Sequence, residues 1–337
     1  MKNMPENWEP PVDAWQSAFD EGIEELVFGY FGCQVLAGKS QSVFERQFLD
    51  GVKSESAPSF VTRAQYVDSS GYENHLFIAY WNSQNAFDAW WQSTPFAEWW
   101  EDDARLKGDT GLWREVFTVP VNRLETLFSS QNPTGAATLG QPFGEPVREH
   151  NYWGGMRDRI PASADNDLLE SAIGDSLPKV KLPESRGKRL RASIPSNFCL
   201  IRSGQNWSDS SDKELETYLD VVRPNLTAGM AFLRDNPMET GCASCRLMDE
   251  TNLDGSAAAQ SFGLALFVSM KHLEDWSKTH PTHLAIFNSF FKMLDAHQGQ
   301  VDLKLWHEVL IVDGSNSICE YVNCHPGTGL LPYFSTI

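Results

Sequence analysis

The feature that most constrains the fold is an internal repeat, in which the second half of the chain restates the first. The segment "LFIAYWNSQNAFDAWWQSTPF" (Leu76–Phe96) aligns with "FGLALFVSMKHLEDWSKTHPT" (Phe262–Thr282) at an offset of 186 residues. "LWREVFTV" (Leu112–Val119) aligns with "LWHEVLIV" (Leu305–Val312) at an offset of 193, so the later copy carries a seven-residue insertion. Self-similarity on this scale predicts two copies of one supersecondary unit.

Hydrophobic periodicity predicts the same order of elements in both copies: a strand, a helix, two strands, a helix with a Pro-marked restart, and a closing strand. The first strand and helix are predicted at Glu25–Leu36 and Ser42–Val52 in the first copy, and at Asn197–Gly204 and Asp212–Asp235 in the second. This β-α-β-β-α-β order is that of the split βαβ, or ferredoxin-like, unit. The predicted fold class is therefore α+β, with two ferredoxin-like repeats joined as an α+β barrel. The expected divisions are an N-terminal arm (1–24), a first repeat (25–128), a connecting segment (129–196), a second repeat (197–325) and a C-terminal tail (326–337).

Composition excludes several classes of partner. The chain has 337 residues, 41% of them hydrophobic, which is enough for a substantial core. Its formal net charge of -18 argues against a nucleic acid partner, because an acidic surface repels phosphate backbones. The N-terminus lacks an apolar signal-like region, and no run of 18 or more apolar residues occurs. We therefore expect a soluble, cytoplasmic protein with no membrane partner.

Two local patterns are interpreted as structural. Cys242-Ala-Ser-Cys245 is a lone C-x-x-C, which could be a redox pair or half of a zinc site, but no second C-x-x-C completes four ligands. We interpret it as two cysteines of a strand and expect reduced thiols throughout. The basic run "KVKLPESRGKRLR" (Lys179–Arg191) contains Pro, Gly and Ser, and is predicted to be a solvated loop rather than an anion site.

The two copies differ at their histidines. His283 stands where the first copy has Ala97, and His307 stands where it has Arg114. If histidine only filled a structural position, both copies would be expected to carry similar residues there. These two imidazoles are therefore candidates for function.

The first candidate lies in "HPTH", ahead of an almost wholly apolar run. Pro281 suits the first position of a helix, which would place His280 near the N-cap and His283 in the first turn. A zinc site would need a third ligand, and the H-E-x-x-H spacing is absent. A single imidazole beside an apolar wall instead suits haem, whose proximal ligand is often one histidine.

The second candidate lies in the alternating strand "LKLWHEVLIV". Alternation predicts that Trp306 points outward while His307 and Val309 face the core side. An imidazole in that position can both donate and accept a proton near neutral pH.

Five short motifs occur in a fixed order along the chain. They are "HNYWGGMRDRIP" (His150–Pro161), "LIRSGQNW" (Leu200–Trp207), "HPTHLAIF" (His280–Phe287), "LWHEV" (Leu305–Val309) and "EYVNCHPGTG" (Glu320–Gly329). Together they resemble the haem-dependent aldoxime dehydratases, also called phenylacetaldoxime dehydratases, from about Trp8 to His325. The resemblance implies a haem b enzyme that converts aldoximes (R–CH=N–OH) to nitriles and water. It also implies a barrel of two ferredoxin-like halves and a homodimer.

The resemblance implies a role for each of five residues. His283 resembles the proximal iron ligand, and His307 resembles the distal acid–base histidine. Arg159, in "MRDR", resembles a distal arginine required for activity. Ser203, in "IRSG", resembles the serine that hydrogen-bonds the oxime hydroxyl, and Glu125, in "RLETLF", resembles the acidic partner of the distal histidine. Without the resemblance, these last three would be an interdomain salt-bridge residue, a turn residue and a carboxylate on a surface helix, respectively.

The implied chemistry places the oxime nitrogen on ferrous haem, with His307 acting first as acid and then as base. Two alternatives remain at this stage: a haem peroxidase or chlorite-dismutase-like enzyme, which would use ferric haem, and a non-catalytic haem sensor or carrier. Redox dependence separates the first alternative from dehydration. The sequence leaves open whether the preferred aldoxime carries an arylalkyl or an alkyl side chain.

Overall fold

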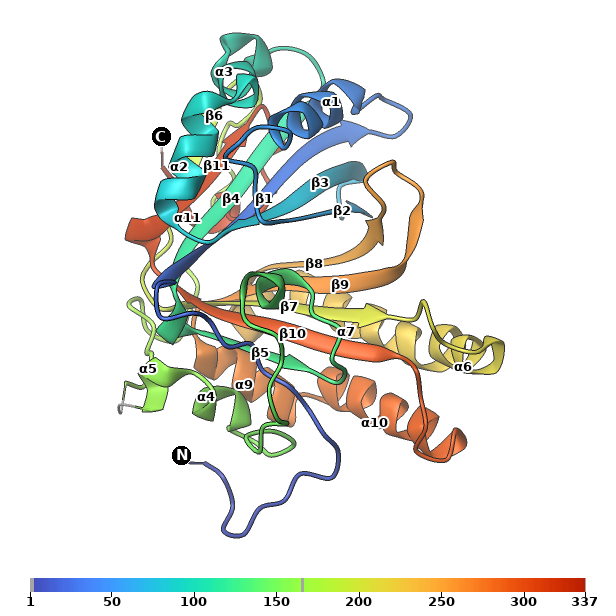
Figure 1. Ribbon diagram of the computed structural model, residues 1–337. Coiled ribbons are helices and arrows are strands. Elements are labelled where there is room, and N and C mark those ends of the chain that lie inside the picture. The colour runs from blue at the N-terminus through green and yellow to red at the C-terminus, as the bar shows by residue number, and fades with distance from the viewer. Residues whose placement is uncertain (1–2, 165–166, 337) are drawn as a thin grey trace.

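The apolar segments of the sequence form one curled antiparallel sheet (Figure 1). The computed structural model describes residues 3–164 and 167–336. Within these residues the strands are β1 (Glu25–Leu36), β2 (Phe60–Val67), β3 (Tyr72–Trp81), β4 (Gly111–Pro120), β5 (Leu124–Phe128), β6 (Arg189–Ala192), β7 (Phe198–Asn206), β8 (Cys242–Thr251), β9 (Ala257–Phe267), β10 (Lys304–Val312), β11 (Ser317–Val322) and β12 (Ser335–Thr336).

The order of the strands repeats between the two copies. The sheet runs β12-β6-β11-β4-β1-β3-β2-β8-β9-β7-β10-β5, so β4-β1-β3-β2 and β10-β7-β9-β8 have the same internal order. The two sets meet where β2 pairs with β8. The predicted strands agree with the observed ones to within a few residues, and the mixed fold with a curled antiparallel sheet agrees with the predicted class.

Two strand pairings were not predicted. After β4 the chain continues into β5, which pairs with β10 of the second copy. After β10 it continues into β11, which pairs with β4 of the first copy. Each copy therefore contributes its last strand to the other, and we call this arrangement the strand exchange.

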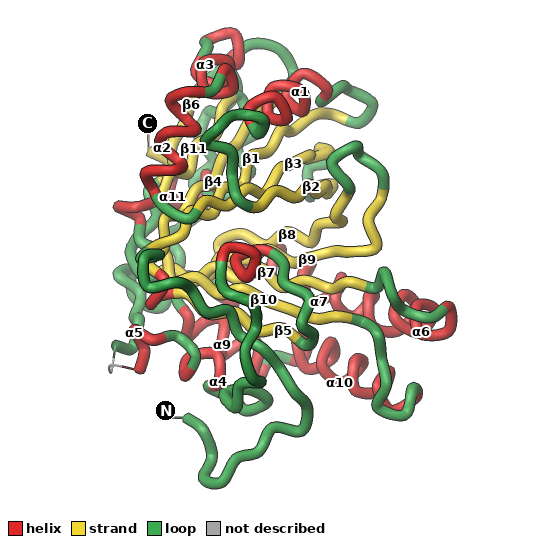
Figure 2. Tube along the Cα trace, in the orientation of Figure 1, coloured by secondary structure: helices red, strands yellow, loops and turns green. Residues whose placement is uncertain are grey.

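Helices cover the outer face of the sheet, as Figure 2 shows in red. In the first copy α1, α2 and α3 pack on β1 and β3, and in the second α7, α9 and α10 lie over β7, β8 and β9. The described helices are α1 (Ser42–Gly51), α2 (Gln84–Ser93), α3 (Pro95–Glu101), α4 (Gly155–Asp158), α5 (Pro161–Ala164), α6 (Asp212–Thr217), α7 (Arg223–Asp235), α8 (Pro237–Thr240), α9 (Met270–Thr279), α10 (Pro281–Ala296) and α11 (Leu331–Phe334).

The inner face of the sheet carries a core shared by both copies. Its packing corrects one prediction, because Trp306 does not point outward: its side chain is buried at 6% exposure on this inner face. Gly204 explains the burial, since a Cβ there would lie 2.1 Å from the Trp306 ring. The first copy repeats the arrangement, with Gly32 beneath Trp113.

Two further predictions need correction. The helix predicted over 212–235 is interrupted by a π turn (Tyr218–Val222), because Pro224 cannot donate to the Asp220 carbonyl and its ring crowds that group. The basic run is only partly a loop, because its end forms β6 and Arg189 pairs there with the buried Glu320 at 2.9 Å.

The cysteines behave as predicted from their dispersal. Cys242 and Cys245 both lie on β8, and all six cysteines of the chain are buried free thiols. Among the described residues, no helix has the length and apolar character needed to cross a membrane.

Candidate active site

His307 is placed by the register of β10 between its two neighbours. It lies opposite Ser203 of β7 on one side and Leu127 of β5 on the other. Because alternate strand residues share a face, His307 points to the same side as Val309, which belongs to the core beneath α9. The imidazole therefore faces the layer between sheet and helices, as predicted, and its side chain is 24% exposed.

Glu125 reaches this histidine from the exchanged strand β5. Its carboxylate lies 2.9 Å from His307 Nε2 and accepts a hydrogen bond from Arg159 Nε at 2.8 Å. Burial alone would raise the pKa of Glu125, but the charges and hydrogen bonds of Arg159 and His307 lower it to about 2. Glu125 is therefore a buried, ionised strand residue and not the surface helix carboxylate that its local sequence suggested.

Arg159 comes to the same point from the connecting segment, directly after α4. Its side chain is 3% exposed, it donates to the backbone carbonyl of Glu149, and its Nη2 lies 3.2 Å from His307 Nε2. The expected interdomain salt bridge exists, as the pair with Glu125. The salt bridge expected from the sequence and the contact implied by the family resemblance are therefore the same contact, between Arg159 and Glu125.

The position of Glu125 determines which ring nitrogen of His307 can exchange protons. A carboxylate accepts hydrogen bonds, so Nε2 must carry hydrogen to bond Glu125 and cannot then accept from Arg159. Nδ1 makes no hydrogen bond to the described residues, and neither does the hydroxyl of Ser203. These two groups are available to an external molecule.

His283 lies in the first turn of α10, and the helix start matches the prediction. His280 is the N-cap, its Nδ1 accepts from the Thr282 backbone N–H, and Pro281 follows. The His283 ring packs edge-on against Trp276 at 4.8 Å between centroids. Burial lowers the pKa of His283, although the Ser277 backbone partly offsets this effect. A neutral imidazole is the form that binds a metal.

The second copy has small residues on the sheet face where the first copy packs aromatic rings, and we call it the small-residue face. Phe31 and Phe77 lie side by side in the first copy, and Phe31 packs against six further aromatic rings. The register places Ser203 and Gly263 at the equivalent positions of the second copy. A Cβ on Gly263 would lie 2.9 Å from Met230 Sδ of α7, so the Met230 side chain packs directly on this glycine.

These observations fit a flat apolar cofactor held by one protein ligand. His283 has a buried Nδ1 without a well-formed hydrogen bond among the described residues, and Ile286 of α10 packs on the same apolar layer. No group of three or more His, Cys, Asp or Glu side chains in residues 3–164 and 167–336 could hold a bare metal ion. A large ring bound by a single imidazole suits these surroundings, whereas a zinc ion does not.

A buried imidazole beside an apolar layer, with a second histidine bonded to a buried carboxylate, is an arrangement suited to a haem protein. Comparison with known proteins gives the family: residues 29–330 match the model of the haem-containing dehydratases. The chain belongs to this family. Haem is accordingly its cofactor.

The individual relatives agree over nearly their whole lengths. The chain is 38% identical to a phenylacetaldoxime dehydratase of Bacillus sp. (strain OxB-1), covering 99% of this chain and 95% of the relative. It is 34% identical to an aliphatic aldoxime dehydratase of Rhodococcus erythropolis, covering 98% and 93%. A crystal structure of an aldoxime dehydratase in complex with butyraldoxime superposes with a TM-score of 0.91 at 34% identity, covering 100% of this chain and 93% of that one.

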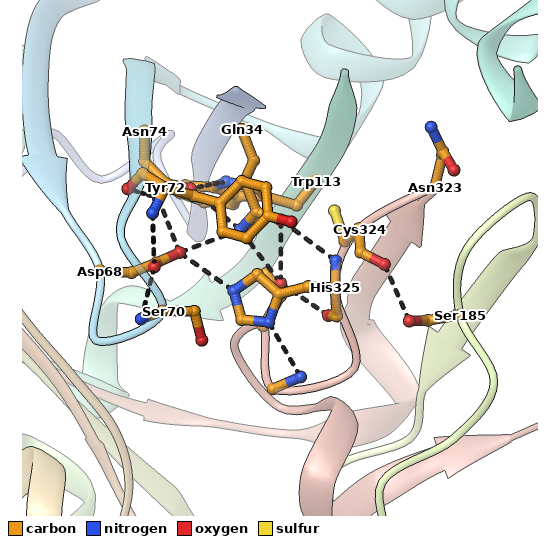
Figure 3. Close-up of polar contacts among 12 residues, drawn as sticks. Gln34, Asp68, Ser70, Tyr72, Asn74, Trp113, Ser185, Asn323, Cys324 and His325 are labelled. Carbon is orange, nitrogen blue, oxygen red and sulfur yellow. Dashed lines mark hydrogen bonds and ion pairs between the residues drawn. The ribbon is translucent and has the colours of Figure 1, made fainter. Parts of the chain in front are cut away.

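The fifth sequence motif lies outside the site. Figure 3 shows His325 beside Asp68, with Tyr72 stacked over its ring. Asp68 accepts hydrogen bonds from His325 Nε2 at 3.0 Å and from Gln34 Nε2 at 3.2 Å. Thr328 also bonds Gln34, so the network attaches the C-terminal segment to the first copy. The role of "EYVNCHPGTG" in this structure is therefore attachment.

Gly263 is the site residue that sequence reasoning missed. The repeat alignment already placed it opposite Phe77, because both lie at the second position of their aligned segments. Loss of a large aromatic residue between the copies is the sequence signal that marks this position.

Proposed function

We propose that this protein is a haem-dependent aldoxime dehydratase, a lyase that converts R–CH=N–OH to R–C≡N and water. The observation that carries the proposal is the group formed by His307, Glu125 and Arg159 beside the small-residue face of Ser203 and Gly263. A non-catalytic haem carrier would not need a buried, ionised Glu125 to hold a partly exposed imidazole.

His283 is the proposed proximal ligand of haem b. The apolar layer under α9 and α10 would hold the ring. Ferrous haem supplies a Lewis acid for the oxime nitrogen and electron density that weakens the N–O bond.

His307 performs both proton transfers in the proposed reaction. The N–O bond breaks with its electron pair on oxygen, and the hydroxyl takes the proton from Nδ1 and leaves as water. The freed Nδ1 then accepts the proton from carbon, while the C–H electron pair becomes the third bond between carbon and nitrogen. Positioned proton transfer of this kind contributes about 10²- to 10⁴-fold in rate.

The neighbouring residues position this chemistry. Glu125 keeps hydrogen on Nε2 and so fixes both the tautomer and the orientation of the His307 ring. Ser203 stands opposite His307, and its free hydroxyl would hold the oxime hydroxyl toward Nδ1. Arg159 would hold the Glu125 carboxylate in place on the Nε2 side of the ring.

The deciding experiment is an anaerobic assay of haem-loaded, dithionite-reduced protein with phenylacetaldoxime and butyraldoxime, following the nitrile. We expect turnover without peroxide, and oxidation of the iron should abolish it. A peroxidase-like enzyme would show the reverse dependence. Nitrile formation from neither aldoxime would refute the proposal.

Two variants test the assignments of the histidines. His283→Ala should purify with little haem, and normal haem content would remove it as the ligand. His307→Ala should keep haem and lose nitrile formation, and near-wild-type turnover would remove it as the acid–base group.

The remaining features of the proposal concern the whole molecule. We propose that the two copies, 25–128 and 197–325, are ferredoxin-like units that form one barrel, which the repeated strand order supports. The arm (1–24), the connecting segment (129–196) and the tail (326–337) complete the division. We also propose a cytoplasmic homodimer; the free, buried thiols support that compartment.

A further inference from the structure

The N-terminal arm runs along the exchanged strand β5 and past α4, as Figure 1 shows in dark blue. Trp15 pairs with Phe128 through two backbone hydrogen bonds of 2.9 Å. Ser17 is joined to Thr126 twice, by its backbone N–H and by its hydroxyl, each at 2.9 Å. The arm is therefore attached to β5 at Thr126 and Phe128, which both follow Glu125 on that strand.

The same arm also holds the segment that carries Arg159. The Gln16 amide donates to the Arg159 carbonyl at 3.3 Å, and the Trp8 indole donates to the His150 carbonyl at 3.0 Å. Asn3 bonds the Asp158 carboxylate with both its backbone N–H and its side-chain amide. Five residues of the arm thus contact the two segments that provide Glu125 and Arg159.

The Arg159 segment has little internal structure to hold it. Its helix α4 has four residues, far fewer than an isolated helix needs to persist. Gly154 begins this helix at φ +99°, and a Cβ on it would lie 2.5 Å from Asn3 Cβ, so the arm packs directly on the turn. Side-chain bonds fix the Arg159 guanidinium, but its backbone carbonyl is held by Gln16.

We infer that the arm, residues 3–17, is a positioning element of the distal site, and that Gln16 is its central residue. Gln16 lies between Trp15, which is paired to β5, and Ser17, which is bonded beside Glu125, while its own side chain fixes Arg159. The arm therefore sets the spacing between the acidic strand and the arginine turn. This inference rests on the proposed function.

Gln16→Leu tests the inference, because leucine keeps much of the glutamine volume but removes the amide. Loss of one hydrogen bond at this position should lower kcat by roughly 2- to 10-fold with little change in KM. Haem content should stay at the wild-type level, because His283 lies on α10. Trp8→Phe, which keeps an aromatic ring but removes the indole N–H, should act in the same direction.

The matched control is Gln141→Leu. Gln141 donates its amide to Asp20 Oδ1 at 2.7 Å, in the stretch that follows residues 3–17, and no hydrogen bond joins it to Glu125 or Arg159. It should leave kcat unchanged. Urea unfolding of all three variants checks that they fold.

Two readouts do not depend on turnover. In the ferrous–carbon monoxide form, the C–O stretching frequency reports the charge beside the bound gas, so Gln16→Leu should shift it and Gln141→Leu should not. In haem-free protein, trypsin should cut within 148–159 faster in Gln16→Leu than in wild type.

The possible results separate cleanly. An active wild type with unchanged kcat, C–O frequency and trypsin rate in Gln16→Leu would overturn the inference and leave the proposed function intact. Loss of haem in parallel with kcat would also overturn it, because the arm would then support the cofactor rather than the distal group. A wild type that makes no nitrile would refute both.

Discussion

Replacing Glu125 by glutamine tests the central argument about the site. Glutamine keeps the size of the side chain but removes the charge that two neighbours share. Arg159 would keep its bond to the Glu149 carbonyl, and His307 would face an amide that can present either oxygen or NH₂ to Nε2. Presenting NH₂ would require Nε2 to accept, which would place hydrogen on Nδ1 in the neutral ring.

The structure sets the size of both effects. Arg159 is 3% exposed and Glu125 is fully buried, so removing one partner leaves an uncompensated charge, which typically costs about 3–5 kcal/mol. After the first proton transfer, the neutral His307 ring would no longer be fixed in the tautomer that has hydrogen on Nε2 and a lone pair on Nδ1. Loss of that positioned transfer should lower kcat by about 10²- to 10⁴-fold.

The assay measures kcat for nitrile formation by reduced, haem-loaded protein, together with urea unfolding between pH 7 and pH 4. Because the pKa of Glu125 in the folded state lies at about 2, below the ordinary 4.5, its stabilising contribution is present above pH 4.5 and is lost as pH falls toward 2. The difference in stability between wild type and Glu125→Gln should therefore shrink at acidic pH.

The control is Glu308→Gln on β10, which follows His307 and points to the opposite face of the sheet. Glu308 is also fully buried, but it faces Arg202 in the inner core and not the site. It should leave kcat unchanged. Equal loss of kcat in both variants, or full activity of Glu125→Gln, would refute the reasoning.

Three further predictions follow from other contacts. Ser203→Phe restores the residue type of Phe31, so the protein should fold but purify with little haem, as measured by Soret absorbance. Ser203→Ala should retain haem and lose activity. Normal haem content in Ser203→Phe would contradict the interpretation of the small-residue face. Burial raises the pKa of Glu308 to about 7 despite Arg202. The free energy of unfolding of the wild type should therefore fall by at most about 3 kcal/mol as pH rises from about 4.5 to 7, and urea titrations of Glu308→Gln should lack that fall. Asp68→Asn weakens the attachment of His325 and should reduce the free energy of unfolding by about 1–2 kcal/mol without changing haem content; an equal loss of haem would show that the network reaches the site.

Much of the fold could be predicted because periodicity and repetition are local signals. The alignment of Trp90 with Trp276 and of Pro95 with Pro281 placed the helix restart, and His280 proved to be the N-cap. The strand exchange could not be predicted, because nothing in the five residues of β5 specifies which copy provides the partner strand. The π turn near Pro224 was not predicted either, because the proline is a local defect whereas tertiary contacts preserve the helix around it.

The site was harder to predict, because its residues gain their properties from distant partners. Nothing near Glu125 in the sequence indicates a buried ionised carboxylate, since its two partners lie 34 and 182 positions away. The gain of His283 and His307 between copies was readable without a structure. The small-residue face could be identified only from the strand register, which shows that Ser203 and Gly263 are neighbours.

The strand exchange has a consequence for how activity depends on assembly. The carboxylate that holds His307 belongs to the first copy, and β5 reaches β10 only when both copies are folded and docked. Neither copy alone can then form a competent distal group, even if the second copy binds haem. Two separately expressed fragments, divided within the connecting segment, would recover nitrile formation only when they associate. The rate of turnover would then measure the amount of associated protein, whereas the haem spectrum would measure the amount of folded second copy.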